Sequence, residues 1–116
     1  MAVASVLVSE ADPDVRRLLI VLIERLGHDA AVLRDDVVVP PRSDLLLVDP
    51  LTRTGLEHLR LVRAFFPEHP VVCINPLPDG AGLLGRGRTW FLPKPFSLEQ
   101  LAPVVDRALS AAAYPV

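Results

Sequence analysis

Apolar residues gather along this chain into five short runs that polar and proline-rich stretches separate. Each run is too brief for a helix, and the first is rich in β-branched valine, so the pattern predicts buried strands. The predicted strands span residues 3–8, 30–33, 45–48, 71–74 and 89–92. The run at 30–33 is the weakest of the five.

The stretch after the first strand has the apolar spacing of a helix packed on a sheet. Asp12 suits the N-cap, Pro13 the first helical position, and Gly27 the residue after the last turn. Between them the apolar residues recur at i, i+3, i+4 and i+7. They are Val15, Leu18, Leu19, Leu22, Ile23 and Leu26.

Two further helices are predicted later in the chain. One spans residues 55–66 and ends at Pro67. The last begins at Ser97, which forms a capping box with Gln100. Pro103 lies two turns inside this helix and is expected to bend it or remove a hydrogen bond.

Two other connections are poor helical material. The first, over 33–44, contains three consecutive valines followed by two prolines at 37–41, which disfavour a helix. The second, over 75–88, holds two prolines and four glycines and supports one or two helical turns at most. We therefore predict that the second helix is vestigial or absent and that the fourth is shortened.

Strands that alternate with helices predict an α/β fold with a parallel sheet and right-handed crossovers. Five strands suit the flavodoxin-like, doubly wound order 2-1-3-4-5, in which ligand sites form at the carboxyl ends of the strands. The length of 116 residues fits a single domain over 1–116.

Composition narrows the function classes. A formal net charge of −2 and 5% aromatic residues give no reason to expect direct nucleic-acid binding. No apolar run approaches the ~18 residues of a membrane span, and the N-terminus lacks the basic start of a signal peptide. Cys73, inside an apolar run, is expected to be a buried thiol in a reducing cytoplasm.

Charged and amide side chains follow four of the predicted strands. Glu10 and Asp12 follow the first, Asp49 the third, Asn75 the fourth and Lys94 the fifth. These groups are expected to converge on one edge of the sheet. Carboxylates plus phosphate oxygens suit magnesium, lysine suits a phosphoryl oxygen, and a carboxylate can accept a phosphoryl group. The pattern indicates a phosphoryl or metal site.

Each residue also has a structural interpretation. Asp12 fits an N-cap better than a ligand, and Asn75 before Pro76 could start a turn. The three histidines, at 28, 58 and 69, show no ligand spacing and are expected to be solvated. No glycine-rich phosphate fingerprint follows the first strand, and no activated nucleophile–base pair is visible, which disfavours a dinucleotide site and an enzyme.

Three motifs resemble the receiver domain of bacterial two-component response regulators. They are residues 6–15 (VLVSEADPDV), 44–49 (DLLLVD) and 91–96 (FLPKPF), and the likeness covers almost the whole chain. The resemblance implies that Asp49 accepts a phosphoryl group from a histidine kinase or phosphotransfer protein. It further implies that Lys94 binds the phosphoryl oxygen and that Phe91 is the aromatic switch residue.

The chain also departs from this family. The acidic pair falls on Glu10 and Ala11, and alanine replaces the usual magnesium ligand. Asn75 stands where the family has the hydroxyl residue that binds the phosphoryl group and relays its presence. The loop after Asp49 is short and keeps only Gly55 of its usual proline and acidic-glycine turn. The pattern is that of a degenerate receiver that binds Mg²⁺ weakly or not at all, with Glu10, Asp49 and Asp12 as its ligands.

Two functions remain open on the sequence. In one, Asp49 is phosphorylated within a cytoplasmic phosphorelay. In the other, the domain is a phosphorylation-independent pseudo-receiver that binds a protein or senses a ligand, with Lys94 and Asp49 in a fixed ion pair. An effector domain or protein target would lie outside this chain. Any homodimer is expected to use the first or last helix, because the stretch 75–88 is too rich in glycine to present a rigid surface.

Overall fold

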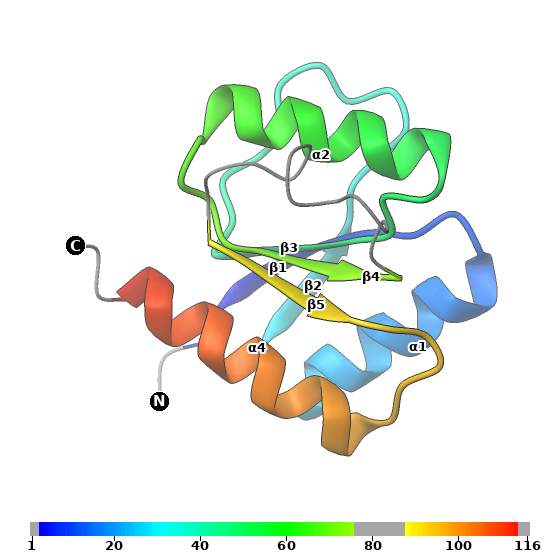
Figure 1. Cartoon of the computed structure of the whole chain (residues 1–116), viewed down its shortest axis with the longest axis vertical. Helices are drawn as coiled ribbons and strands as arrows, with labels where there is room; N and C mark the ends of the chain where they lie inside the picture. The colour runs from blue at the N-terminus through cyan, green and yellow to red at the C-terminus, as the bar shows by residue number, and fades with distance from the viewer. Residues whose placement is uncertain (1–2, 76–87, 114–116) are drawn as a thin grey trace.

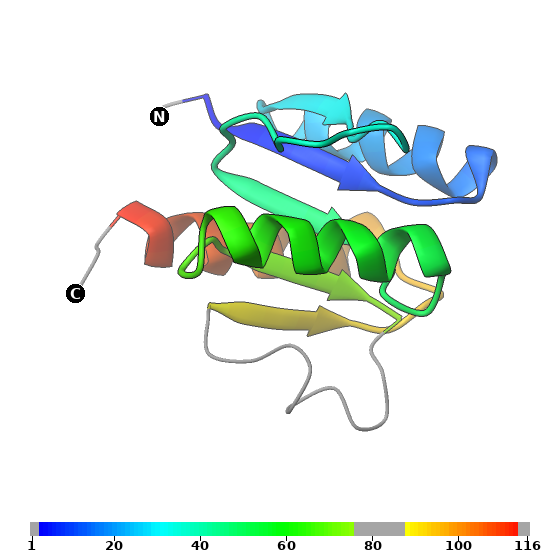
Figure 2. The same cartoon turned by 90° about the horizontal axis from the view of Figure 1, so that it is seen from above.

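The computed structural model describes residues 3–75 and 88–113, which form a parallel five-stranded sheet between helices. The strands lie in the order β2-β1-β3-β4-β5, as predicted. Their bounds are β1 Ser5–Ser9, β2 Asp29–Val32, β3 Leu45–Val48, β4 Val71–Ile74 and β5 Thr89–Leu92. The arrowheads of all the strands point the same way in Figure 2, so their carboxyl ends share one edge.

Three helices are present in the described part of the chain: α1 Pro13–Arg25, α2 Arg53–Phe65 and α4 Leu98–Ala113. Figure 1 shows α1 and α4 on one face of the sheet and α2 on the other. Both faces are therefore covered over β3 and β4, where every residue is buried. Strands buried on both faces read as continuous apolar runs, which is why these two were visible in the sequence.

The predicted helix boundaries are largely confirmed. The Asp12 carboxylate accepts hydrogen bonds from the amides of Asp14 and Val15 and caps α1. Gly27 has a φ of 91°, a left-handed conformation that favours glycine. The capping box of α4 is formed, since Ser97 N donates to Gln100 Oε1 at 2.8 Å and Gln100 N donates to Ser97 Oγ at 3.3 Å.

Residues 34–44 contain no helix, which confirms the prediction for the second helical position. Leu33 and Val37 nevertheless pack into the core on the α2 face of the sheet. The predicted shortening of the fourth helix falls on residues 76–87, which lie outside the described residues. The prediction that a homodimer would avoid that stretch lies outside them too.

Two sequence-based boundaries were wrong by two residues. The first strand was predicted from Val3 and begins at Ser5. The helix predicted from Gly55 begins at Arg53, because Thr52 is its N-cap and accepts a hydrogen bond from Gly55 N. Cys73 is fully buried, as expected. Burial raises the pKa of its thiol to about 12, so the thiol is protonated at neutral pH.

Candidate functional site

Three charged side chains meet at the carboxyl edge of the sheet. Lys94 follows β5, and its Nζ donates to Asp49 Oδ2 at 2.8 Å and to Glu10 Oε2 at 2.9 Å. Asp49 directly follows β3 and Glu10 directly follows β1, so each residue is delivered by the end of a different strand. The convergence expected from the parallel topology is confirmed for these three residues.

The two carboxylates are almost fully buried. The Glu10 and Asp49 side chains are 2% and 5% exposed, whereas that of Lys94 is 26% exposed. Each carboxylate also accepts one backbone hydrogen bond, from Asp12 N to Glu10 Oε1 at 3.1 Å and from Leu51 N to Asp49 Oδ1 at 3.0 Å. Every oxygen of the pair therefore has a donor, as a buried charged group requires.

The electrostatic balance of this cluster is negative. Two carboxylates face one ammonium, and Lys94 is the only lysine in the chain. Burial alone would lower the pKa of the Lys94 ammonium, but the hydrogen bonds and charges of Asp49 and Glu10 together raise it. Lys94 therefore stays charged at neutral pH, and the cluster can accept further positive charge.

The loop after Asp49 is compact and tied to that residue. Thr52 Oγ1 donates to the Asp49 carbonyl at 3.0 Å and accepts from Gly55 N at 3.0 Å. A Cβ atom at position 55 would lie 1.8 Å from the Asp49 carbonyl oxygen. Glycine is thus required for the close approach of α2 to the strand end, which explains why this loop kept its glycine.

In the described part of the chain, the side chains of the other predicted site residues make no hydrogen bond or ion pair with Lys94, Glu10 or Asp49. The Asp12 carboxylate is engaged as the cap of α1 and is exposed. Asn75 has a φ of 63°, and its backbone N–H donates to the Leu92 carbonyl at 3.1 Å. The Phe91 side chain is half-exposed, at 46%. Their roles remain predictions.

The donor set for a metal ion is small. Ala11 is exposed and offers only a methyl group where a carboxylate would add a ligand. Within residues 3–75 and 88–113, no three His, Cys, Asp or Glu side chains are grouped so as to hold a metal ion. Glu10 and Asp49 alone supply carboxylate oxygens beside Lys94.

The expectation that the histidines are solvated was wrong. His58 is 4% exposed and its Nδ1 lies 2.6 Å from Ser9 Oγ. His28 is also buried, and its Nδ1 accepts from Ala4 N at 3.1 Å. His69 is partly buried and bonds through Nε2 to Ser43 Oγ at 2.9 Å.

Ser9 and His58 form a contact between a hydroxyl and an imidazole that was not visible in the sequence. Both side chains are buried, at 3% and 4% exposure. Within residues 3–75 and 88–113, His58 Nε2 has no hydrogen-bond partner. Ser9 and His58 both line a cavity of about 100 Å³, to which Glu10 and Ala11 also contribute. A signal was present, because His58 shares the inward face of α2 with Gly55 and Val62 at helical spacing.

No helix in the described residues is both long and apolar enough to cross a membrane.

No protein-family model matches the chain. The chain does, however, match individual proteins of known sequence and structure. The chain is 28% identical over 121 residues to the DNA-binding transcriptional regulator NtrC of Azospirillum brasilense, a match that covers 96% of this chain and 25% of the relative. It thus spans about a quarter of that relative's length.

Solved structures give a consistent result. NtrX from Brucella abortus superposes with a TM-score of 0.80 at 26% identity, over 97% of this chain and 28% of that one. The receiver domain of the sensor histidine kinase PA1611 from Pseudomonas aeruginosa, solved with a magnesium ion in its active-site cleft, has a TM-score of 0.73. That match is 18% identical and covers 94% of this chain and 99% of the other, so it supports the fold alone.

Proposed function

We propose that this chain, an atypical receiver domain of the two-component response-regulator family, accepts a phosphoryl group on Asp49. The donor is a histidine kinase or a phosphotransfer protein. The observation that carries the proposal is the bonding of Lys94 Nζ to both Asp49 and Glu10 at the carboxyl edge of the sheet. The edge presents an acceptor carboxylate and a fixed positive charge side by side.

The chemistry follows from these groups. An Asp49 carboxylate oxygen attacks phosphorus, the bond between phosphorus and the donor's histidine nitrogen breaks, and the released imidazole takes up a proton. The Lys94 ammonium pairs with the oxygens of the transferred group, because lysine is a compact point charge suited to phosphate. Asn75, which follows β4, contributes its side-chain amide as a further donor to the phosphoryl group.

The carboxylates of this site are just sufficient for the usual coordination of magnesium in proteins. Mg²⁺ is bound in proteins by one or two carboxylates together with substrate phosphate oxygens and water, and Glu10 and Asp49 provide two such carboxylates. When bound, the ion neutralises charge on the transferring group. Because Ala11 adds no ligand and Asp12 caps α1, we expect weak binding or none.

Phosphorylation would be read out through Asn75 and Phe91. The backbone of Asn75 is in the left-handed conformation, and its backbone N–H donates to the Leu92 carbonyl. Leu92 is the sequence neighbour of the half-exposed Phe91. A change in how Asn75 bonds at the site would therefore reach the end of β5 directly. The longer relatives suggest that an effector domain receives this signal, and we place the domain in the bacterial cytoplasm.

The test is incubation with magnesium and a small phosphodonor, followed by intact-mass measurement. Wild type is expected to gain one phosphoryl group and Asp49→Asn none. Asp106→Asn serves as the matched control, because Asp106 is an exposed carboxylate on α4, outside the cluster. An adduct that persists in Asp49→Asn would contradict the assignment.

A second function is favoured by a specific observation. Lys94 already neutralises part of the charge on both carboxylates without a metal ion, and Ala11 removes a ligand. A phosphorylation-independent pseudo-receiver would use this closed ion-pair cluster to hold a fixed protein-binding surface. In that case neither wild type nor Asp49→Asn gains mass, and wild type binds its protein partner with the same affinity before and after treatment with phosphodonor.

A further inference from the structure

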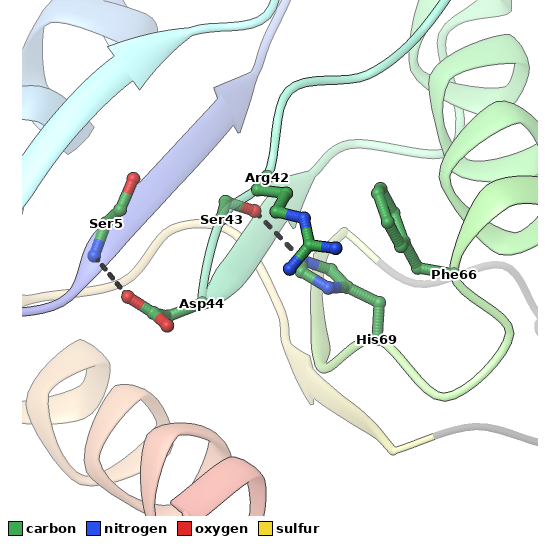
Figure 3. A pocket seen from close by; sticks show the side chains of 6 residues that line it. All are labelled: Ser5, Arg42, Ser43, Asp44, Phe66 and His69. Carbon is green, nitrogen blue, oxygen red and sulfur yellow. Dashed lines mark hydrogen bonds between the residues drawn. The ribbon is translucent and has the colours of Figure 1, made fainter.

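A hollow of about 380 Å³ lies at the amino edge of the sheet, opposite Asp49. Figure 3 shows its lining: Ser5 from the start of β1, the segment 42–44 that precedes β3, and Phe66 and His69 from the connection after α2. Its volume falls in the range of roughly 300–1,000 Å³ typical of small-molecule sites. No residue of the Lys94 cluster contributes to it.

Two of its polar side chains are fixed within the protein. Asp44 Oδ2 accepts from Ser5 N at 2.7 Å, and Asp44 N donates to the Ser5 carbonyl at 2.7 Å. Ser43 Oγ is 2.9 Å from His69 Nε2. These bonds hold the segment before β3 against both β1 and the connection after α2, so the walls of the hollow are set by long-range contacts.

Two charges at the hollow are left without a partner in the described part of the chain. The Arg42 guanidinium makes no hydrogen bond or ion pair there, and in Figure 3 it overlaps the His69 ring, with Phe66 to one side. The second carboxylate oxygen of Asp44, Oδ1, also accepts no hydrogen bond in that part. One free positive and one free negative group therefore line the same hollow, with Arg42 on the side of the apolar Phe66 ring and Asp44 beside Ser5.

The other ionisable groups near the hollow leave its net charge close to zero. The pKa of His69 is lowered by burial and by the nearby Arg63, against an opposing effect of Asp44, so His69 is neutral at physiological pH. Arg63 is committed elsewhere, because its guanidinium donates to the carbonyls of Pro67 and His69 and to Thr89 Oγ1. A simple anion would meet Asp44, and a simple cation would meet Arg42.

We propose that this hollow binds a small zwitterion with an apolar side chain, of the α-amino acid class. The ligand carboxylate pairs with Arg42, its ammonium pairs with Asp44 Oδ1, and its side chain lies against Phe66. A guanidinium forms bidentate bonds with a carboxylate, and an ammonium forms charge-assisted bonds with a carboxylate oxygen. The site is separate from the proposed phosphoacceptor and gives the domain a second, ligand-sensing input.

The affinity is expected to be modest, because Arg42 and Asp44 are both exposed and exposed ion pairs contribute little. Binding in the millimolar range is the corresponding expectation. Such affinity is measured by following backbone amide shifts in nuclear magnetic resonance spectra during ligand titration. The amides of Ser43, Asp44 and His69 are the reporters.

The probes are L-leucine, leucinamide, which lacks the carboxylate, and N-acetyl-L-leucine, which lacks the ammonium. L-leucine is expected to shift the three reporter amides, and both blocked analogues to bind at least about tenfold more weakly. Arg42→Gln and Asp44→Asn are each expected to weaken L-leucine binding about tenfold. Arg17→Gln, an exposed arginine on α1, is the matched control and keeps wild-type affinity.

Three results of these titrations would each overturn the proposal. No shift at tens of millimolar L-leucine would overturn the proposal, and so would equal affinity for either blocked analogue. An unchanged affinity in Arg42→Gln would overturn it as well, and this variant is expected to fold because Arg42 is exposed and makes no hydrogen bond or ion pair within residues 3–75 and 88–113. The titration needs neither magnesium nor phosphodonor, so its result is independent of whether Asp49 is phosphorylated.

Discussion

Replacing Lys94 with methionine removes the one ammonium that faces two buried carboxylates. Methionine keeps the length and apolar stem of the side chain, so the change is chiefly one of charge. Glu10 and Asp49 each lose a hydrogen bond, of 2.9 Å and 2.8 Å, and each keeps one backbone donor. The expected result in the absence of magnesium is a less stable protein.

The expected loss of stability in Lys94→Met lies between two limits. Leaving a fully buried charge unpaired costs about 3–5 kcal/mol, and losing an exposed ion pair costs about 0–1 kcal/mol. Here the carboxylates are 2% and 5% exposed but the lysine is 26% exposed, so we expect a loss of about 2 kcal/mol. For a domain of this size that corresponds to a melting temperature lower by roughly 8 °C.

The assay is urea and thermal denaturation followed by Trp90 fluorescence, at neutral pH and low salt. Arg53→Met is the matched control, because the Arg53 and Glu57 side chains of its ion pair are 93% and 61% exposed and its loss is expected to cost less than about 0.5 kcal/mol. Magnesium is expected to recover part of the loss in Lys94→Met, since it supplies positive charge to the same carboxylates.

The pH dependence has a definite sign. The folded-state pKa of Lys94 is raised above its ordinary value of 10.5, so its contribution to the free energy of unfolding is complete below that pH. The contribution is lost as pH rises through the raised value. The difference between wild type and Lys94→Met is therefore constant around neutral pH and shrinks in strong alkali. A variant as stable as Arg53→Met would refute the role of Lys94 in holding the carboxylates.

Three other changes test separate parts of the structure. Ala11→Asp is expected to tighten magnesium binding about tenfold, or ~1.4 kcal/mol, and to lower stability without metal; calorimetry giving equal affinities for both proteins would contradict the missing-ligand interpretation. Ser9→Val and His58→Leu each leave a buried polar atom unpaired and are expected to cost about 1–3 kcal/mol, whereas the double variant costs less than their sum; additive losses in a denaturation cycle would mean that the 2.6 Å contact contributes no coupling. Cys73, with its thiol pKa raised to about 12 by burial, is expected to react with a thiol reagent far more slowly in the native protein than in urea, and equal rates would show that the thiol is accessible.

Much of the fold could be predicted because its signals are local. The strands are continuous apolar runs, and parallel topology then places Glu10, Asp49 and Lys94 at one edge without knowledge of any contact. Capping is local too, which is why Asp12 and the box of Ser97 with Gln100 were correct.

The errors concern polar groups that pair across distant elements. Ser9 and His58 are 49 residues apart, and neither has a local pattern that points to the other. A histidine on an otherwise apolar face was interpreted as solvated, although its helical spacing placed it inward. The hollow at the amino edge was not predicted for the same reason, since the contact of Ser43 with His69 joins residues 26 positions apart.

The central claim is that Asp49 accepts a phosphoryl group, and borohydride trapping tests it most directly. Borohydride reduces an aspartyl phosphate to homoserine, so the modified position can be read by peptide sequencing after treatment with magnesium and a small phosphodonor. Homoserine at position 49 in wild type, and none in Asp49→Asn, is the predicted result. Homoserine found only at another aspartate, or at no position in wild-type protein that remains folded, would contradict it.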